Sequence, residues 1–163
     1  MAIRTRVGQG FDIHRFVDGP SDRVLVLGGV KFPNEKPLAG HSDADVIAHA
    51  AADALLGAAS LGDIGMHFPD TDPQWAGANS LTLLAHVAKI VREAGFEIGN
   101  VDCSIVCEKP KIAPHREAMQ KLLSDAAGAT ITVKGRRAEG LGALGREEGI
   151  ACWAVAVIER TQA

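Results

Sequence analysis

The sequence predicts an α+β fold, in which helices cover one face of a mixed β-sheet. Segments with strand alternation and segments with helical periodicity are mixed along the chain, and both a hairpin and longer crossovers join them. The last apolar segment, residues 150–160, carries alanine and valine on both of its faces, so burial on both sides is expected. One helical layer covers only one face of a sheet, which leaves the other face for a partner subunit.

The strands are expected where apolar and polar residues alternate between turn signals. Residues 3–14 form the first strand, and residues 24–32 form two short strands around a Gly28-Gly29 hairpin turn. Further strands are expected at 100–108, 130–135 and 150–160. Together these segments supply the mixed sheet.

The clearest helix is expected at residues 43–58, where apolar residues recur at intervals of three and four. Ser42 is the expected N-cap, and Asp45, three residues later, can complete a capping box. The spacing of four also places Asp45, His49 and Asp53 on one side of this helix. A neighbouring carboxylate could therefore orient the His49 imidazole.

Two further helices are expected at residues 80–95 and 114–128. Residues 139–149 are too rich in glycine for a regular element, so they are expected to form a functional loop. Residues 61–73 carry three acidic side chains among glycine and proline. Such acids usually make turns, but they could also receive the hydroxyl groups of a sugar or polyol.

Composition favours a single domain of residues 1–163 and argues against several classes of function. A length of 163 residues with 47% hydrophobic residues can bury a core. A net charge of −3 and only 4% aromatic residues disfavour nucleic acid and anionic membranes as partners. No apolar stretch suits a membrane span, and no hydrophobic leader is apparent at the N-terminus. Cys103, Cys107 and Cys152 lie in apolar runs, as expected for core residues of a cytoplasmic protein.

A metal site is indicated by two residues near the N-terminus and one on the first helix. Asp12 and His14 lie two apart, hence on the same face of a strand. Carboxylate oxygen and imidazole nitrogen both bind zinc, and His49 would complete a three-ligand site with an open fourth position. The alternative is structural: Asp12 caps a turn, and His49 is a hydrogen-bonded core histidine.

An anion site is indicated immediately before the first helix. His41 and Ser42 can present a side chain and backbone N–H groups to an anion at the helix N-terminus. The simpler interpretation is that Ser42 serves only as the N-cap. The sequence leaves both interpretations open.

Four stretches carry a resemblance that covers residues 3 to 160. They are GFDIH, HSDADVIAHAAADALLGAASLGDIGMHFPDTDP, NVDCSIVCEKPKIAPH and EGLGALGREEGIA. In this combination the chain resembles the 2-C-methyl-D-erythritol 2,4-cyclodiphosphate synthase family. The resemblance implies a ferredoxin-like, chorismate-mutase-like subunit that assembles as a homotrimer, with sites between subunits.

The resemblance also implies a reaction of the non-mevalonate isoprenoid pathway. The substrate would be 4-diphosphocytidyl-2-C-methyl-D-erythritol 2-phosphate, whose 2-phosphate attacks the β-phosphorus. The products would be 2-C-methyl-D-erythritol 2,4-cyclodiphosphate and CMP, which makes the enzyme a phosphorus–oxygen lyase. Such a transfer depends on positioning and charge neutralisation.

The family's metals and catalytic groups map onto specific positions of this chain. Zn²⁺ would bind Asp12, His14 and His49, the trio also indicated by the spacing. Mg²⁺ or Mn²⁺ would bind the substrate diphosphate and Glu139. His41, Arg137 and Glu139 are the expected catalytic residues.

The family's substrate contacts fall into an N-terminal set, an acidic loop, a cytidine segment and a late loop. They map onto Asp12, Ile13, His14, His41, Ser42, Asp63, Ile64, Gly65, Phe68, Pro69, Asp70, Thr71, Asp72, Cys107, Glu108, Lys109, Pro110, Lys111, Ile112, Ala113, Arg136, Arg137, Ala138, Glu139, Ala143 and Arg146. Lys111 is expected near the phosphates, whereas Lys109 is expected at the surface.

The late loop departs from the family pattern. Arg136 and Arg137 occupy positions where the family usually has threonine, and Ala143 replaces a bulkier residue, while Arg146 keeps its place. Either the guanidinium groups take over the diphosphate contact, for which their forked donors are suited, or they point to solvent.

Two other functions are consistent with parts of the sequence. A metallophosphoesterase can also begin with Asp-x-His, but it needs a later Gly-Asn-His block for a two-metal centre, which this sequence lacks. A non-catalytic binder of nucleotides or isoprenoid phosphates would accommodate the altered late loop. Formation of CMP without free phosphate separates the cyclase from both alternatives.

Overall fold

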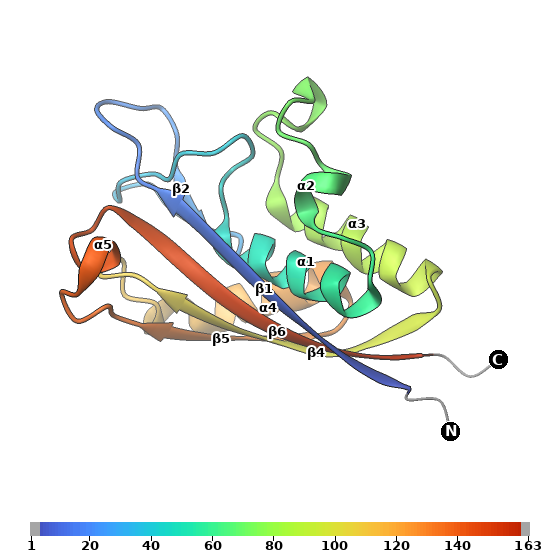
Figure 1. The fold of residues 1–163 in the computed structure, drawn as a ribbon. Coiled ribbons are helices and arrows are strands. Elements are labelled where there is room, and N and C mark those ends of the chain that lie inside the picture. The colour runs from blue at the N-terminus through green and yellow to red at the C-terminus, as the bar shows by residue number, and fades with distance from the viewer. Residues whose placement is uncertain (1–3, 161–163) are drawn as a thin grey trace.

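Four strands form the central sheet in a computed structural model that describes residues 4–160 (Figure 1). Across the sheet they lie in the order β1 (Thr5–Arg15), β6 (Gly149–Arg160), β4 (Phe96–Val106) and β5 (Thr130–Arg136). β6 runs antiparallel to both of its neighbours, whereas β4 and β5 are parallel. The predicted mixed sheet is therefore confirmed.

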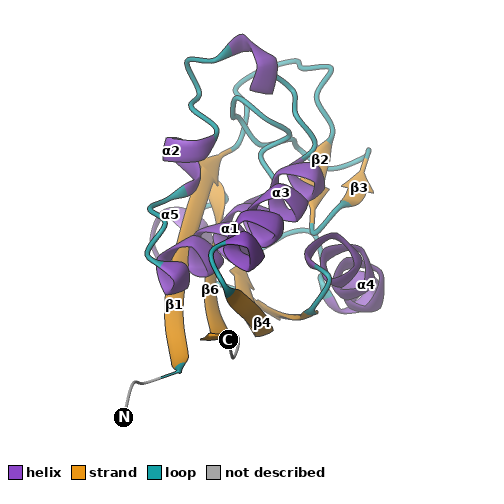
Figure 2. Ribbon diagram, turned by 90° about the vertical axis from the view of Figure 1, so that its right-hand side faces the viewer, coloured by secondary structure: helices purple, strands orange, loops and turns teal. Residues whose placement is uncertain are grey.

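Three longer helices form a layer against this sheet (Figure 2). They are α1 (Val46–Ala59), α3 (Ser80–Glu93) and α4 (Arg116–Ala127). One hydrophobic core lies between the two layers and includes the buried, free cysteines Cys103, Cys107 and Cys152. In the part of the chain that the structure describes, no helix has the length and apolar character needed to cross a membrane.

Short elements connect the layers. They are β2 (Leu25–Leu27), β3 (Val30–Phe32), α2 (Ile64–His67), η1 (Pro73–Trp75), η2 (Ala113–His115) and α5 (Gly142–Gly145). β2 and β3 pair antiparallel, as the Gly28-Gly29 signal predicted. The late loop was predicted to be irregular, and this is wrong at α5, where a single helical turn closes through the backbone bond from Gly145 N to Leu141 O.

Strand boundaries differ from the prediction by one to four residues, most clearly in β1 and β4. β1 begins at Thr5 and continues to Arg15, and residue 3 of the expected strand lies outside the described residues. β4 begins four residues earlier than expected, at Phe96, because a bulge between Ile98 and Asn100 lets the pairing continue past Gly99. Because the bulge interrupts the alternation of apolar and polar residues, residues 96–99 were not predicted to belong to this strand.

The predicted N-cap of α1 is wrong: the cap is Asp45, not Ser42. The Asp45 carboxylate accepts hydrogen bonds from Ile47 N at 3.1 Å and Ala48 N at 3.3 Å. Ala44 has a φ of +60°, which breaks the helical path between Ser42 and α1. The Ser42 hydroxyl instead accepts a hydrogen bond from Ala44 N, so it does not cap α1.

Asp45 also ties the β2–β3 hairpin to α1. Its two carboxylate oxygens accept from Gly28 N at 2.8 Å and from Gly29 N at 2.7 Å. Burial and the charge of Asp43 raise the pKa of Asp45 to about 6, although the amide donors of Gly28 and Gly29 oppose that rise. This buried carboxylate therefore fixes the segment that leads into the first helix.

Within a single chain the final strand is buried on one face and partly exposed on the other. Its inner face, which includes Ala154 and Ala156, is covered by the helices. On the outer face Trp153 is 41% exposed and Val155 is 47% exposed. Phe11 of β1 packs against Trp153 with ring centroids 5.0 Å apart, so the outer face carries an apolar patch across β1 and β6.

β1 lies directly against the backbone of α1 because two of its inward positions are glycines. A Cβ added to Gly8 would lie 2.0 Å from Ala54 O, and one added to Gly10 would lie 2.0 Å from Ala50 O. Neither carbonyl can move without breaking the helix, so only glycine fits at these positions. This close contact sets how near the later residues of β1 come to α1.

Gly10→Ala is expected to destabilise the protein strongly, by more than about 3 kcal/mol, because the methyl group meets helix backbone rather than a movable side chain. Gly57→Ala is the matched control. Gly57 is exposed on α1, and the nearest neighbour of an added Cβ is Gln9 O at 3.7 Å, so the change should stabilise by about 1 kcal/mol through helix propensity. Thermal and urea unfolding measure both variants, and equal stability of the two would contradict the interpretation.

Candidate active site

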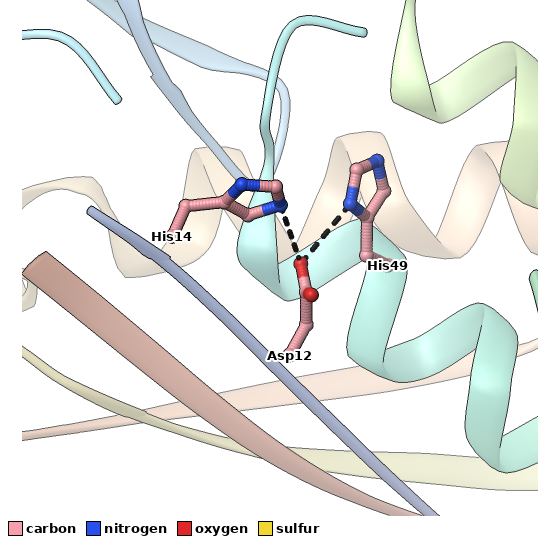
Figure 3. Close-up of side chains that lie close together, drawn as sticks. All are labelled: Asp12, His14 and His49. Carbon is pink, nitrogen blue, oxygen red and sulfur yellow. Dashed lines mark hydrogen bonds and ion pairs between the residues drawn. The ribbon is translucent and has the colours of Figure 1, made fainter. Parts of the chain in front are cut away.

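Three side chains from β1 and α1 converge on one point (Figure 3). The Asp12 Oδ2 atom lies 3.1 Å from His14 Nε2 and 3.0 Å from His49 Nδ1. One ligand atom from each residue lies within 4.8 Å of the others, which is a spacing that a single metal ion can bridge. The trio indicated by the sequence is thus assembled by the fold.

The state of His14 fits a metal ligand. His14 Nδ1 lies 2.7 Å from the carbonyl oxygen of Ala39, to which it donates, and this leaves Nε2 as the nitrogen with a free lone pair. Nε2 is buried and makes no hydrogen bond, although Asp12 lies beside it. A buried nitrogen without a partner, next to a carboxylate oxygen, matches the donor set of a zinc or similar divalent ion.

Electrostatics also favour a cation here. Burial alone would raise the pKa of the Asp12 carboxyl, but its contacts with His14 and His49, and their charges, hold that pKa well below its usual range. Burial lowers the pKa of His49, but the hydrogen bond and charge of Asp12 outweigh this effect, so the pKa of His49 is raised. Asp12 is therefore ionised at neutral pH and supplies negative charge to the site.

The predicted carboxylate partners of His49 on its own helix are wrong. Asp45 is occupied as the helix cap, and Asp53 accepts from Ile64 N at 2.8 Å. The partners of His49 Nε2 are instead hydroxyl groups, Ser80 Oγ at 2.8 Å and Ser42 Oγ at 3.2 Å. His49 is therefore a buried, hydrogen-bonded histidine, as in the structural alternative. Its Nδ1 atom is also close enough to Asp12 and His14 to bind a metal ion with them.

A pocket of about 440 Å³ opens at the trio. It is lined by Asp12, His14, Gly40, His41, Ser42, His49, Ile64, Gly65, Phe68, Pro69, Asp70, Trp75 and Leu83. Gly40, Trp75 and Leu83 were not predicted from the sequence. Trp75 packs edge-on against Phe68 with ring centroids 4.9 Å apart. Trp75 lies two residues after the loop at 61–73, and no periodic signal there indicated this aromatic pair.

The acids of that loop are divided between two roles. The Asp63 carboxylate accepts from Met66 N at 3.0 Å, and the Asp72 carboxylate accepts from Gln74 N at 3.0 Å, so both cap short helical turns. Asp70 lines the pocket and is free of such a capping bond among residues 4–160. His41 Nε2 lies 3.0 Å from the Asp72 carbonyl oxygen, which holds the imidazole at the pocket edge.

A second pocket, of about 280 Å³, lies between the end of β4, the start of α4 and the end of β5. It is lined by Cys107, Glu108, Pro110, Lys111, Ile112, Ala113, Arg116, Gly135, Arg136 and Arg137. Arg116 and Gly135 were not predicted from the sequence. The two pockets share no lining residue, so a single chain presents them as separate sites.

The second pocket is strongly cationic. Lys111, Arg116, Arg136 and Arg137 line it, and within the described ranges none of the four is ion-paired with a carboxylate. Glu108 is the only acidic residue in the lining, and its carboxylate accepts from Ala138 N at 2.7 Å. Glu108 therefore fixes the backbone after Arg137, and the pocket is left with uncompensated positive charge suited to phosphate.

Other predicted site residues line neither pocket. They are Ile13, Asp63, Thr71, Asp72, Lys109, Ala138, Glu139, Ala143 and Arg146. Ile13 lies on the outer face of the sheet and is 51% exposed. Lys109 pairs with Glu147 at 3.4 Å, and Arg146 pairs with Glu148 at 2.8 Å.

The same architecture occurs in a known family. The model of the YgbB family matches residues 5–159, which is nearly the whole chain. The chain belongs to the YgbB family. Matches to curated proteins and to solved structures extend this membership of the YgbB family over the full fold.

A 2-C-methyl-D-erythritol 2,4-cyclodiphosphate synthase of Bacillus cereus is 52% identical over 158 residues, which cover 95% of this chain and 98% of the relative. The bifunctional IspDF of Campylobacter jejuni has a TM-score of 0.91 at 38% identity, covering 99% of this chain and 44% of that one. A CDP complex of Plasmodium falciparum IspF has a TM-score of 0.84 at 33% identity, covering 98% of each chain. These proteins are thus similar to this chain in both sequence and fold.

Zinc affinity is expected to fall as the pH falls, because a metal ion must displace any proton held by His49. The pKa of His49 lies above its ordinary value of 6.5, so the decline should begin above that pH. Asp12 stays ionised throughout and adds no proton competition, because its pKa is held low.

Competition with a chromophoric chelator across the neutral and mildly acidic range measures this affinity. His14→Ala should abolish zinc binding. His86→Gln should leave the zinc affinity unchanged, because His86 lies on α3 and outside the trio. A zinc affinity independent of pH across this range would contradict the assignment of His49 as a ligand.

Proposed function

We propose that this chain is a phosphorus–oxygen lyase that converts 4-diphosphocytidyl-2-C-methyl-D-erythritol 2-phosphate to 2-C-methyl-D-erythritol 2,4-cyclodiphosphate and CMP. The reaction belongs to the non-mevalonate isoprenoid pathway and would take place in the cytoplasm. The observation that carries the proposal is the ligand trio of Asp12, His14 and His49 in a chain that matches the YgbB family over residues 5–159.

The chain's own residues suit an intramolecular transfer of a phosphoryl group. Zn²⁺ held by Asp12, His14 and His49 would polarise a phosphoryl oxygen as a Lewis acid. The attacking 2-phosphate is already an anion, so the site needs no additional base, and holding both ends of one molecule lowers the barrier. His41 and Ser42 line the same pocket, where the Ser42 hydroxyl can donate a hydrogen bond to a phosphate oxygen.

The cationic pocket is the proposed site for the cytidine and its diphosphate. Lys111, Arg136 and Arg137 would neutralise phosphate charge, and the two arginines would replace the hydroxyl contacts usual in the family. Main-chain groups of 107–113 would read the base. Glu139, in the loop that follows, would bind the Mg²⁺ or Mn²⁺ that accompanies the diphosphate.

The active enzyme is proposed to be a homotrimer with sites between subunits. Two features of the single chain support this proposal. The metal pocket and the cationic pocket share no residue, so a neighbour is needed to bring one of each together. The exposed apolar patch that includes Phe11, Trp153 and Val155 lies on the uncovered face of the sheet, where a partner would bury it.

Incubation with the cytidyl substrate and both metals tests the reaction. The proposed cyclase releases one CMP per cyclic diphosphate formed and no inorganic phosphate, as followed by chromatography and ³¹P NMR. Release of inorganic phosphate would instead indicate a metallophosphoesterase. Substrate binding without CMP release would indicate a non-catalytic binder.

Arg137→Thr is expected to lower kcat/KM for CMP formation by about 10- to 100-fold, which matches the loss of a charged hydrogen bond worth roughly 1.5–3 kcal/mol. Lys121→Thr removes a cation that pairs with Asp125 on the exposed side of α4, and it should leave kcat/KM unchanged. Unaltered turnover by Arg137→Thr would mean that this guanidinium does not contact the diphosphate.

Trp153→Glu is expected to dissociate the trimer, because it places a charge in the centre of the apolar patch on the outer face of the sheet. Leu122→Glu makes the same kind of change on the helical layer, where Leu122 is 37% exposed, and should preserve the trimer. Sedimentation velocity measures both variants. A wild-type chain that sediments as a monomer would rule out shared sites.

A further inference from the structure

His49 has a second hydrogen-bonding side that the trio does not use. Its Nδ1 faces Asp12 at 3.0 Å, whereas its Nε2 faces away from the trio toward Ser80 Oγ at 2.8 Å. Ser80 is 1% exposed and His49 is 9% exposed, so water does not compete for this contact. Ser80 is the first residue of α3, 31 residues from His49 in sequence.

The single proton of the Ser80 hydroxyl is committed to a carboxylate. Ser80 Oγ donates to Asp43 Oδ1 in a short hydrogen bond, and Ser80 N donates to Asp43 Oδ2 at 3.0 Å. Asp43 is itself held in place, because its backbone N–H donates to Ala78 O at 3.0 Å. Since a carboxylate can only accept, Ser80 Oγ has no proton left for His49 and must accept from it.

This proton count fixes which nitrogen of His49 carries hydrogen. Nε2 must be the N–H that donates to Ser80, which leaves the Nδ1 lone pair for a metal ion beside Asp12. Without the Ser80 acceptor only the longer contact to Ser42 would remain at Nε2, and the anionic Asp12 would favour a proton on Nδ1. Asp12 directly, and Asp43 through the Ser80 hydroxyl, thus compete for the single proton of the neutral His49 imidazole.

We propose that Asp43 and Ser80 are positioning residues that hold His49 in its metal-binding tautomer. The proposal rests on the proposed metal site and extends it by a hydroxyl–carboxylate pair from two other segments of the chain. The same arrangement explains why His49 has no carboxylate partner on its own helix. The pair acts through His49, and neither residue lines either pocket.

The same count assigns a role to Ser42. Its Oγ lies 3.2 Å from His49 Nε2 and accepts from Ala44 N at 3.2 Å, so it is a second, longer acceptor for the imidazole. The Ser42 proton is then not needed within this network. Because Ser42 lines the metal pocket, that proton is available to a phosphate oxygen.

Ser80→Ala tests the proposal through zinc affinity, measured by chelator competition with the whole protein. The expected loss is about 10- to 100-fold, the usual effect of removing a group that orients a metal ligand. Asn79→Ala is the matched control. Asn79 directly precedes Ser80 and caps the same helix by accepting a hydrogen bond from Leu81 N, but it does not contact His49. Equal affinity of Ser80→Ala and Asn79→Ala would overturn the proposal.

A double-mutant cycle separates the pair from simple charge effects. If Asp43 acts through Ser80, then Asp43→Ala added to Ser80→Ala should reduce zinc affinity no further than Ser80→Ala alone. If Asp43 acts only by its charge on His49, the two losses should add, and additivity would refute the coupled pair. Thermal unfolding of each variant confirms that the fold is retained.

The tautomer itself can be read from the imidazole ¹⁵N shifts of metal-free wild-type protein at a pH where His49 is neutral. The proton is expected on Nε2 in the wild type and on Nδ1 in Ser80→Ala. A wild-type proton on Nδ1 would overturn the proposal. This readout needs neither metal nor substrate, so it stands or fails independently of the cyclase activity and of zinc binding.

Discussion

Direct contact between the backbone of β1 and the backbone of α1, permitted by Gly8 and Gly10, is the constraint on which the site depends. Two residues along a strand advance the chain by about 6.6 Å, close to the 5.4 Å or so of one helical turn. Gly8 meets Ala54, and Gly10 meets Ala50, one helical turn earlier. The next inward position, Asp12, contacts His49, the residue beside Ala50 on the helix. A bulkier residue at either glycine would move the carboxylate away from the imidazole.

The loop before α1 and the start of α3 complete this geometry from the other side. His49 is held between Asp12 and the hydroxyl of Ser80, and Asp43 joins that hydroxyl to the loop. Asp45 fixes the same loop through four backbone donors, two of them in the β2–β3 turn. A buried polar network is stabilising only when all its members have partners, and the nitrogen left without one is His14 Nε2, which faces the centre of the trio.

The trio was predictable because each of its parts is a local pattern: a period of two on a strand and a histidine on a strongly periodic helix. Ser80 and Arg116 were not predictable, since their roles arise from contacts between segments distant in sequence. The helix start was misplaced because the positive φ of Ala44 leaves no mark in the residue type. Burial of the outer face of β6 was expected, but at Trp153 and Val155 a single chain does not supply it, because the three longer helices lie on the other face.

The central claim is that a carboxylate oxygen and two imidazole nitrogens bind one divalent ion. Anomalous diffraction at the zinc edge, on crystals of protein purified without chelators, tests it most directly. One zinc peak per chain is expected, about 2.0–2.2 Å from Asp12 Oδ2, His14 Nε2 and His49 Nδ1. A zinc-soaked crystal with no peak at this position, or with a peak that contacts His49 through Nε2, would contradict it.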